Sequence, residues 1–141
     1  MGLLKAHSSL TREMSAELVT KHGLTINDYE VLLRLSRAEG RRMRRVDLAE
    51  QVMLTPSGIT RLLDGLERFG YVERAACASD RRVTYAVLTD EGLAKLREAS
   101  ETHLADVQNA LASRLSPEEL ETLAGLLDRL YGDSESASCA P

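Results

Sequence analysis

The sequence lacks most of the features that mark membrane and secreted proteins. No stretch approaches the roughly 20 consecutive apolar residues of a membrane-spanning helix, and the first residues lack the charged, apolar and small-residue order of a secretion signal. The two cysteines, Cys77 and Cys139, form neither a CxxC pair nor a disulfide framework, which fits a reducing compartment. We therefore expect a cytoplasmic protein without membrane contact.

The sequence also lacks a catalytic or metal-binding pattern. Its serines, histidines and aspartates form no nucleophile elbow and no metal motif. No glycine-rich loop follows a strand to hold a phosphate, and the three histidines lie far apart in the chain. We predict that the protein is not an enzyme and that it uses no catalytic residue, metal ion or cofactor.

Positive charge is concentrated in the middle of the chain. The net charge is −4, but residues 37–82 contain ten arginines and seven acidic residues, whereas residues 83–141 contain four basic and eleven acidic residues. Local charge decides whether a polyanion can dock. The middle segment is therefore the candidate for nucleic-acid binding.

Residues 55–70 form the most distinct predicted helix. Thr55 suits the N-cap, Pro56 suits the first helical position and Gly70 ends the helix. Its predicted core-facing stripe consists of Ile59, Leu62, Leu63, Leu66 and Phe69. The other side carries Ser57, Thr60, Arg61, Asp64, Gly65 and Arg68. Such a face fits the major groove of DNA, but an ordinary solvated face has the same composition.

The neighbouring segments favour the first interpretation. A short helix predicted over residues 46–52 precedes this one after a tight turn, which gives a helix-turn-helix. Residues 71–74 and 83–88 are rich in β-branched and aromatic residues and predict a hairpin whose tip contains Arg81 and Arg82. Arginine at such a tip can enter the minor groove. The four arginines of residues 41–45 suit either a solvated connection or phosphate contact.

Amphipathic helices are predicted on both sides of this region. One covers residues 3–21, and a second begins at a capping box of Thr25 and Asp28 and runs to Gly40. A long helix follows Thr89, and a last one begins at residues 116–119 with a further capping box. The terminal helices have more apolar surface than a small winged core can cover, which favours a homodimer. The tail, residues 132–141, is predicted to be disordered.

Five consecutive motifs together resemble the MarR family of winged-helix transcriptional regulators. They are LAE (residues 48–50), LTPSGITRLLDGLE (54–67), GYVER (70–74), DRR (80–82) and LTDEG (88–92). The resemblance implies a mainly α fold with a small β-hairpin wing. A winged helix-turn-helix over residues 25–89 would be flanked by dimerisation helices at 1–22 and 90–131, so residues 1–131 would form a single MarR-like domain.

The resemblance also implies roles for individual residues. The helix that carries Ser57, Thr60 and Arg61 would lie in the major groove, Asp80 would orient the wing, and Arg82 would enter the minor groove. The complete predicted DNA-binding set is Arg44, Thr55, Ser57, Gly58, Thr60, Arg61, Arg81 and Arg82.

Two departures from the family pattern concern helix ends and phosphate contacts. The short helix follows Arg44, Arg45 and Val46, where relatives often have a Ser or Thr cap. Gly65 replaces an arginine common in the family, which removes one phosphate contact and costs roughly 1 kcal/mol of helix propensity relative to alanine.

We predict a homodimeric, sequence-specific regulator that binds a pseudo-palindromic operator in double-stranded DNA. Relatives commonly act as repressors released by small aromatic or anionic molecules. Tyr29, His7 and Arg12 are conceivable pocket residues, but ordinary packing or surface roles explain each of them better, so they stay outside the predicted site.

Two alternatives remain open at this point. Cys77, close in sequence to Arg74, Arg81 and Arg82, could acquire thiolate character and make the regulator redox-responsive. The winged helix could instead bind another protein.

Overall fold

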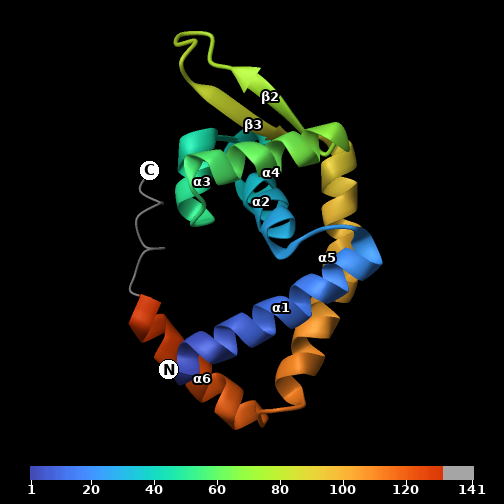
Figure 1. The fold of residues 1–141 in the computed structure, drawn as a ribbon, viewed down its shortest axis with the longest axis vertical. Helices are drawn as coiled ribbons and strands as arrows, with labels where there is room; N and C mark the ends of the chain where they lie inside the picture. The colour runs from blue at the N-terminus through green and yellow to red at the C-terminus, as the bar shows by residue number, and fades with distance from the viewer. Residues whose placement is uncertain (132–141) are drawn as a thin grey trace. The chain divides into compact units, whose positions relative to one another are not determined.

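Helices make up most of the described part of the chain, residues 1–131 of a computed structural model (Figure 1). In chain order the elements are α1 (Gly2–His22), α2 (Ile26–Arg37), the short 3-10 helix η1 (Glu39–Arg41), β1 (Arg42–Arg44), α3 (Arg45–Gln51), α4 (Pro56–Arg68), β2 (Val72–Ala76), β3 (Thr84–Leu88), α5 (Asp90–Ala112) and α6 (Pro117–Tyr131). They form two compact units, one from Met1 to Leu104 and one that begins at Ala105. The tail predicted to be disordered, residues 132–141, lies outside the described residues.

The core of the first unit joins helices α1 to α4, the sheet and the first part of α5. Its most deeply buried large side chains are Leu18, Val31, Leu32, Leu35, Leu48 and Ile59. At the start of α2, the Thr25 hydroxyl accepts the Asp28 N–H at 3.1 Å and the Asp28 carboxylate accepts the Thr25 N–H at 2.8 Å. The predicted capping box is therefore confirmed, although α2 ends at Arg37 and not at Gly40.

Helix α4 has the ends that the sequence predicts. Thr55 caps its first turn, Pro56 is its first residue and Gly70 has a left-handed φ of 76° just beyond it. The placement of Phe69 in the core-facing stripe is wrong. The helix ends at Arg68, so Phe69 leaves the stripe, is 71% exposed and stacks on Tyr71 with ring centroids 5.8 Å apart.

The predicted hairpin is present as β2 and β3, and β1 adds a third strand to give an antiparallel sheet in the order β1-β3-β2. Strand β1 pairs Arg42 with Val87 and Arg44 with Tyr85. Part of the segment predicted as either a solvated connection or a phosphate contact is therefore a strand, although its arginines are exposed. The strand forms because Met43 packs against the core while the arginines on either side of it face outward.

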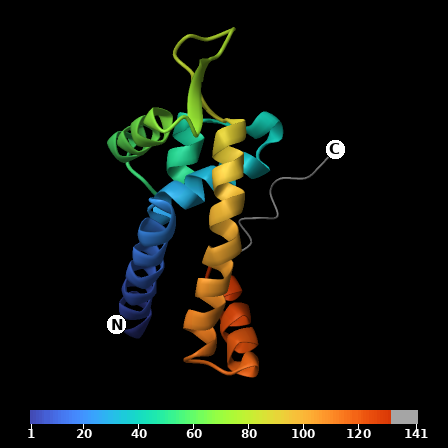
Figure 2. The same cartoon turned by 90° about the vertical axis from the view of Figure 1, so that its right-hand side faces the viewer.

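The hairpin of β2 and β3 extends beyond the helices of the first unit (Figure 2). At its base the Thr89 hydroxyl donates to the Gly70 carbonyl at 2.6 Å and accepts the Gly92 N–H at 3.0 Å. A Cβ atom on Gly92 would lie 2.1 Å from the Tyr71 carbonyl oxygen. Only glycine fits there, so the first turn of α5 packs directly against the start of the hairpin.

The second unit contains the end of α5 and helix α6. The Ser116 hydroxyl accepts the Glu119 N–H at 3.2 Å and the Glu119 carboxylate accepts the Ser116 N–H at 2.8 Å, which confirms the predicted capping box. Helix α6 keeps apolar side chains in solvent, including Leu126 and Leu130.

Within residues 1–131, no helix has the length and apolar character needed to cross a membrane.

Candidate nucleic-acid interface

Exposed hydroxyl groups gather at the start of α4. The Thr55 hydroxyl accepts the Gly58 N–H at 3.1 Å, and the Ser57 hydroxyl oxygen lies 3.3 Å from the Thr55 hydroxyl oxygen. A Cβ atom on Gly58 would come within 3.1 Å of the same Thr55 oxygen, so glycine keeps the cap uncrowded. The first turn thus presents two small polar side chains and little bulk, as a surface that approaches DNA requires.

One turn later, Thr60 and Arg61 differ in how their polar groups are used. The Thr60 hydroxyl donates to the Pro56 carbonyl at 2.8 Å and lies 3.5 Å from Nη1 of Arg45 on α3. Arg61 is exposed and forms no ion pair with any residue that the structure describes. Its guanidinium is therefore available to a phosphate or a guanine edge.

Arg44 is the predicted site residue whose charge is already compensated. Its Nε lies 2.7 Å and its Nη2 3.0 Å from the two carboxylate oxygens of Asp47. The hydrogen bonds and charge of Asp47 raise the pKa of Arg44 above its usual value. Any contact between Arg44 and DNA would compete with this internal pair.

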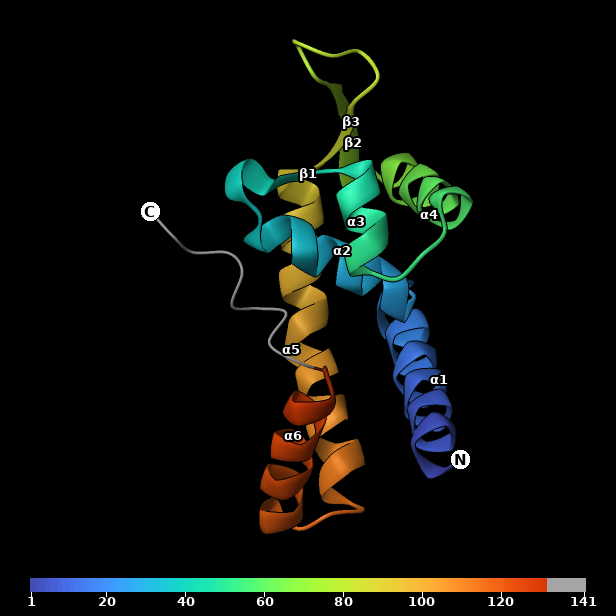
Figure 3. The same cartoon turned by 90° about the vertical axis from the view of Figure 1, so that its left-hand side faces the viewer.

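A hydrogen-bonded turn orders the tip of the hairpin. The Asp80 carboxylate accepts the Arg82 N–H at 2.9 Å, and the Asp80 carbonyl accepts the Val83 N–H at 3.1 Å. Both Arg81 and Arg82 are exposed. The hairpin extends beyond α3 and α4, so its tip and helix α4 belong to the same end of the first unit (Figure 3).

Arg74 on β2 is a residue that sequence reasoning did not assign to the site. It pairs with Asp64, and its Nε lies 3.0 Å from Oε2 of Glu67. Asp64 and Glu67 are one turn apart on α4, so their spacing is compatible with a shared cationic partner. The sequence does not show that this partner is Arg74, because the packing of β2 against α4 is not known from it. The ion pairs connect the second half of α4 to the hairpin.

Cys77 lies at the start of the turn and is partly exposed. Its Sγ is 3.1 Å from the Ser79 hydroxyl. That hydrogen bond, followed by those from the backbone of Ser79 and Asp80, lowers the pKa of the Cys77 thiol. The direction agrees with the predicted thiolate character, but the cause is Ser79 and not the neighbouring arginines.

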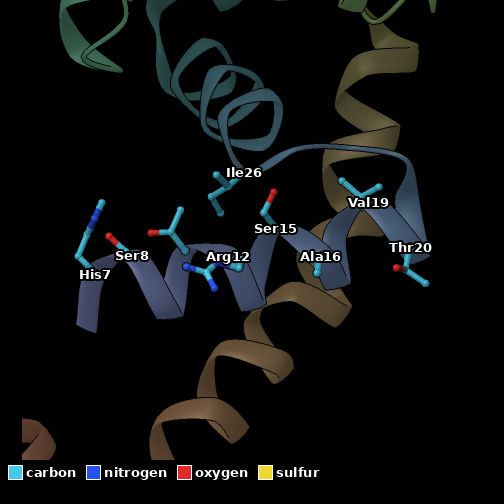
Figure 4. A pocket seen from close by; sticks show the side chains of 9 residues that line it. His7, Ser8, Arg12, Ser15, Ala16, Val19, Thr20 and Ile26 are labelled. Carbon is cyan, nitrogen blue, oxygen red and sulfur yellow. The ribbon is translucent and has the colours of Figure 1, made fainter. Parts of the chain in front are cut away.

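An open groove of about 770 Å³ runs along α1 (Figure 4). It includes two of the three candidate pocket residues, His7 and Arg12, together with Val19 and, from α2, Ile26. The third candidate, Tyr29, is 6% exposed, and its hydroxyl lies 3.1 Å from that of Ser100. Tyr29 is therefore a core residue.

The described residues contain no group of three or more His, Cys, Asp or Glu side chains that could hold a metal ion.

The fold and this surface define a winged helix-turn-helix regulator. The sequence model of the MarR family matches residues 24–84. The transcriptional regulator MhqR of Bacillus subtilis is 30% identical over 128 residues, which cover 91% of this chain and 86% of MhqR. The transcriptional repressor YetL of the same organism is 32% identical over 109 residues, 77% of this chain and 65% of YetL.

Solved structures agree with this class. AbsC, a MarR family transcriptional regulator from Streptomyces coelicolor, has 37% identity and a TM-score of 0.81, covering 92% of this chain and 87% of AbsC. Sco3205 from the same organism, solved in complex with DNA, has 30% identity and a TM-score of 0.84, covering 92% of this chain and 81% of Sco3205. The chain belongs to the MarR family and is a DNA-binding transcriptional regulator, not an enzyme.

Proposed function

We propose that the chain is a homodimeric cytoplasmic repressor that a small molecule releases from a pseudo-palindromic operator. The observation that carries the DNA-binding part is that arginines on α4 and at the hairpin tip are exposed, and that these two elements lie at one end of the first unit (Figure 3). The likeness to Sco3205, which was solved with DNA, supports the same part.

In this proposal α4 enters the major groove. Ser57 and Arg61 contact bases or phosphates, while Thr55 and Gly58 shape the first turn so that the backbone can approach DNA. Arg81 and Arg82 extend the contact into the adjacent minor groove, where narrow segments concentrate negative potential. The hydrogen bond from the Arg82 N–H to Asp80 supports an orienting role for Asp80.

The homodimer is supported by apolar side chains that each unit leaves in solvent. They include Leu3 and Leu4 on α1, and Leu126 and Leu130 on α6, the last of which is 73% exposed. Burying such side chains in a symmetric dimer removes them from water. Two-fold symmetry then sets half-site centres about 10–10.5 base pairs apart, or a multiple of that distance.

The groove along α1 is the proposed site for the releasing molecule. Arg12 and His7 supply polar groups, and Val19 and Ile26 supply apolar surface, which suits a small aromatic anion. Such a ligand releases DNA only if it binds better to a dimer whose two recognition helices no longer match the half-site spacing. The name of YetL, a repressor, supports the direction of regulation.

The test is a titration of the protein against a labelled duplex from the region upstream of its own gene and against a scrambled duplex. If that region holds no operator, a duplex selected from a randomised pool replaces it. We expect tight binding to the operator, with a salt dependence that corresponds to several released counterions. No binding at low salt would reject the proposal and favour the protein-interaction alternative.

Two further measurements separate the parts of the proposal. Sedimentation should give a dimer, and a monomer that still binds DNA would reject the symmetric mode. A panel of aromatic carboxylates should weaken operator binding by the parent more than by Arg12→Ala. If no member of the panel weakens binding by the parent, the groove loses its assigned role.

A further inference from the structure

The four arginines of residues 41–45 differ in how the chain holds them. Arg41 Nη1 lies 2.9 Å from Asp90 Oδ1, and Arg44 forms two hydrogen bonds with Asp47. The Arg42 guanidinium lies 5.0 Å from the centre of the Tyr85 ring. Three of the four are thus engaged within the chain.

Arg45 is held differently. It is exposed, it begins α3, and it forms no ion pair within residues 1–131. Within residues 1–131 the only side-chain hydrogen-bond partner of its guanidinium is the Thr60 hydroxyl, 3.5 Å from Nη1. The next residue, Val46, is 71% exposed, so the first turn of α3 is open to a partner.

Thr60 is suited to position this guanidinium. Its hydroxyl has one hydrogen, which it donates to the Pro56 carbonyl at 2.8 Å, so its oxygen is left as an acceptor for Arg45. An arginine has five N–H donors, and a single bond to Thr60 leaves most of them for another acceptor. The Thr60 hydroxyl itself has no further hydrogen to give to a base.

We infer that Arg45 binds a DNA phosphate at the edge of the groove that α4 enters, and that Thr60 positions Arg45 and does not read a base. This inference rests on the proposed DNA binding. It selects Arg45 among the four arginines for which phosphate contact was left open, and it replaces the predicted direct contact of Thr60 with a positioning role. A phosphate is favoured over a base because Arg45 belongs to α3, the helix that precedes the recognition helix in a helix-turn-helix.

The test compares Arg45→Ala with Arg97→Ala, which removes the same charge from an exposed position on α5 about two turns after the start of that helix. The probes are the operator selected by the parent from a randomised pool and a scrambled duplex. Arg45→Ala should weaken binding to both duplexes on the order of tenfold and lower the salt slope by about 1. Arg97→Ala should leave both quantities close to those of the parent.

Thr60→Val removes the hydroxyl and keeps the size of the side chain. It should weaken binding several-fold in the parent and have no further effect in the Arg45→Ala background, because its role acts through Arg45. An equal loss in both backgrounds would mean that Thr60 contacts DNA directly and would overturn its positioning role. Thermal unfolding of each variant checks that the fold is retained.

The failures of the two proposals can be told apart. If the parent binds its operator and Arg45→Ala binds equally well, the role of Arg45 is overturned while the proposed function stands. A loss confined to the operator would indicate a base contact and overturn the phosphate assignment. No DNA binding by the parent at low salt would overturn the proposed function and this inference with it.

Discussion

Arg74 on β2 forms ion pairs with both Asp64 and Glu67 on α4, the second at 3.0 Å from its Nε. One cation therefore compensates two carboxylates on α4. Exposed ion pairs contribute little to stability, about 0–1 kcal/mol each. Their larger effect is expected on DNA binding, because uncompensated carboxylates beside the groove would repel phosphates.

Arg74→Ala should therefore weaken operator binding several-fold. Because it removes two exposed ion pairs, it should lower the free energy of unfolding by at most about 2 kcal/mol. Fluorescence anisotropy at two salt concentrations and thermal unfolding measure the two effects. In the Arg74→Ala background, Asp64→Asn with Glu67→Gln should restore much of the affinity. Failure of this double change to restore binding would show that repulsion is not the cause.

Arg82→Ala should weaken operator binding without unfolding the protein. The side chain is exposed, and the turn is held through the Arg82 N–H, which the substitution keeps. The loss should correspond to about 1–3 kcal/mol, with a salt slope lower by about 1 if the contact is to phosphate. Unchanged affinity at physiological salt would remove the hairpin tip from the proposed interface.

Gly65→Ala should stabilise the protein by about 0.5–1 kcal/mol, because alanine favours the helix interior and nothing lies within 4 Å of the new Cβ atom. For a chain of this length that corresponds to a rise in Tm of about 2–4 °C per kcal/mol. Calorimetry measures the change. A fall in Tm would mean that the added methyl group disturbs α4.

Gly92→Ala should have the opposite effect, because its Cβ atom would overlap the Tyr71 carbonyl. Overpacking of this kind typically costs about 1–3 kcal/mol, and here the neighbour is backbone, which cannot move aside cheaply. Chemical denaturation gives the free energy of unfolding. Wild-type stability in Gly92→Ala would show that α5 can shift away from the hairpin.

Ser79→Ala should slow the alkylation of Cys77 at pH values below the pKa of its thiol. The Ser79 hydroxyl lowers that pKa, so its removal raises the pKa and leaves less thiolate at a given pH. The rate against pH, measured in a Cys139→Ser background, should move to higher pH. The redox alternative needs a further result, a loss of DNA binding after peroxide in the parent but not in Cys77→Ser.

The features that the sequence predicts well depend on neighbouring residues. The ends of α4 follow from Thr55, Pro56 and Gly70, and the capping box of α2 follows from Thr25 and Asp28, so each signal lies within a few residues of the structure it sets. The five motifs within residues 48–92 then give the order of the helix-turn-helix and the hairpin along the chain.

The features that the sequence does not predict depend on distant pairing. Strand β1 has only three residues, and its partner, β3, lies far along the chain. The local sequence therefore gives no strand signal, and the arginines of β1 resemble those of a connecting segment. The engagement of Arg44 by Asp47 could be guessed from their spacing, but the contact of Arg45 with Thr60 depends on how α3 packs against α4. A composition-based count of arginines therefore overstates how many are available to DNA.

The close approach of Gly92 to Tyr71 also bears on how a signal could travel through the first unit. The Tyr71 carbonyl occupies the space of a side chain, and Thr89 joins the Gly70 carbonyl to the first turn of α5. These contacts hold the first turn of α5 against the start of the hairpin. A tilt of α5 would therefore move the hairpin and the end of α4 together with it. The surface proposed to contact DNA would then change its orientation as α5 tilts.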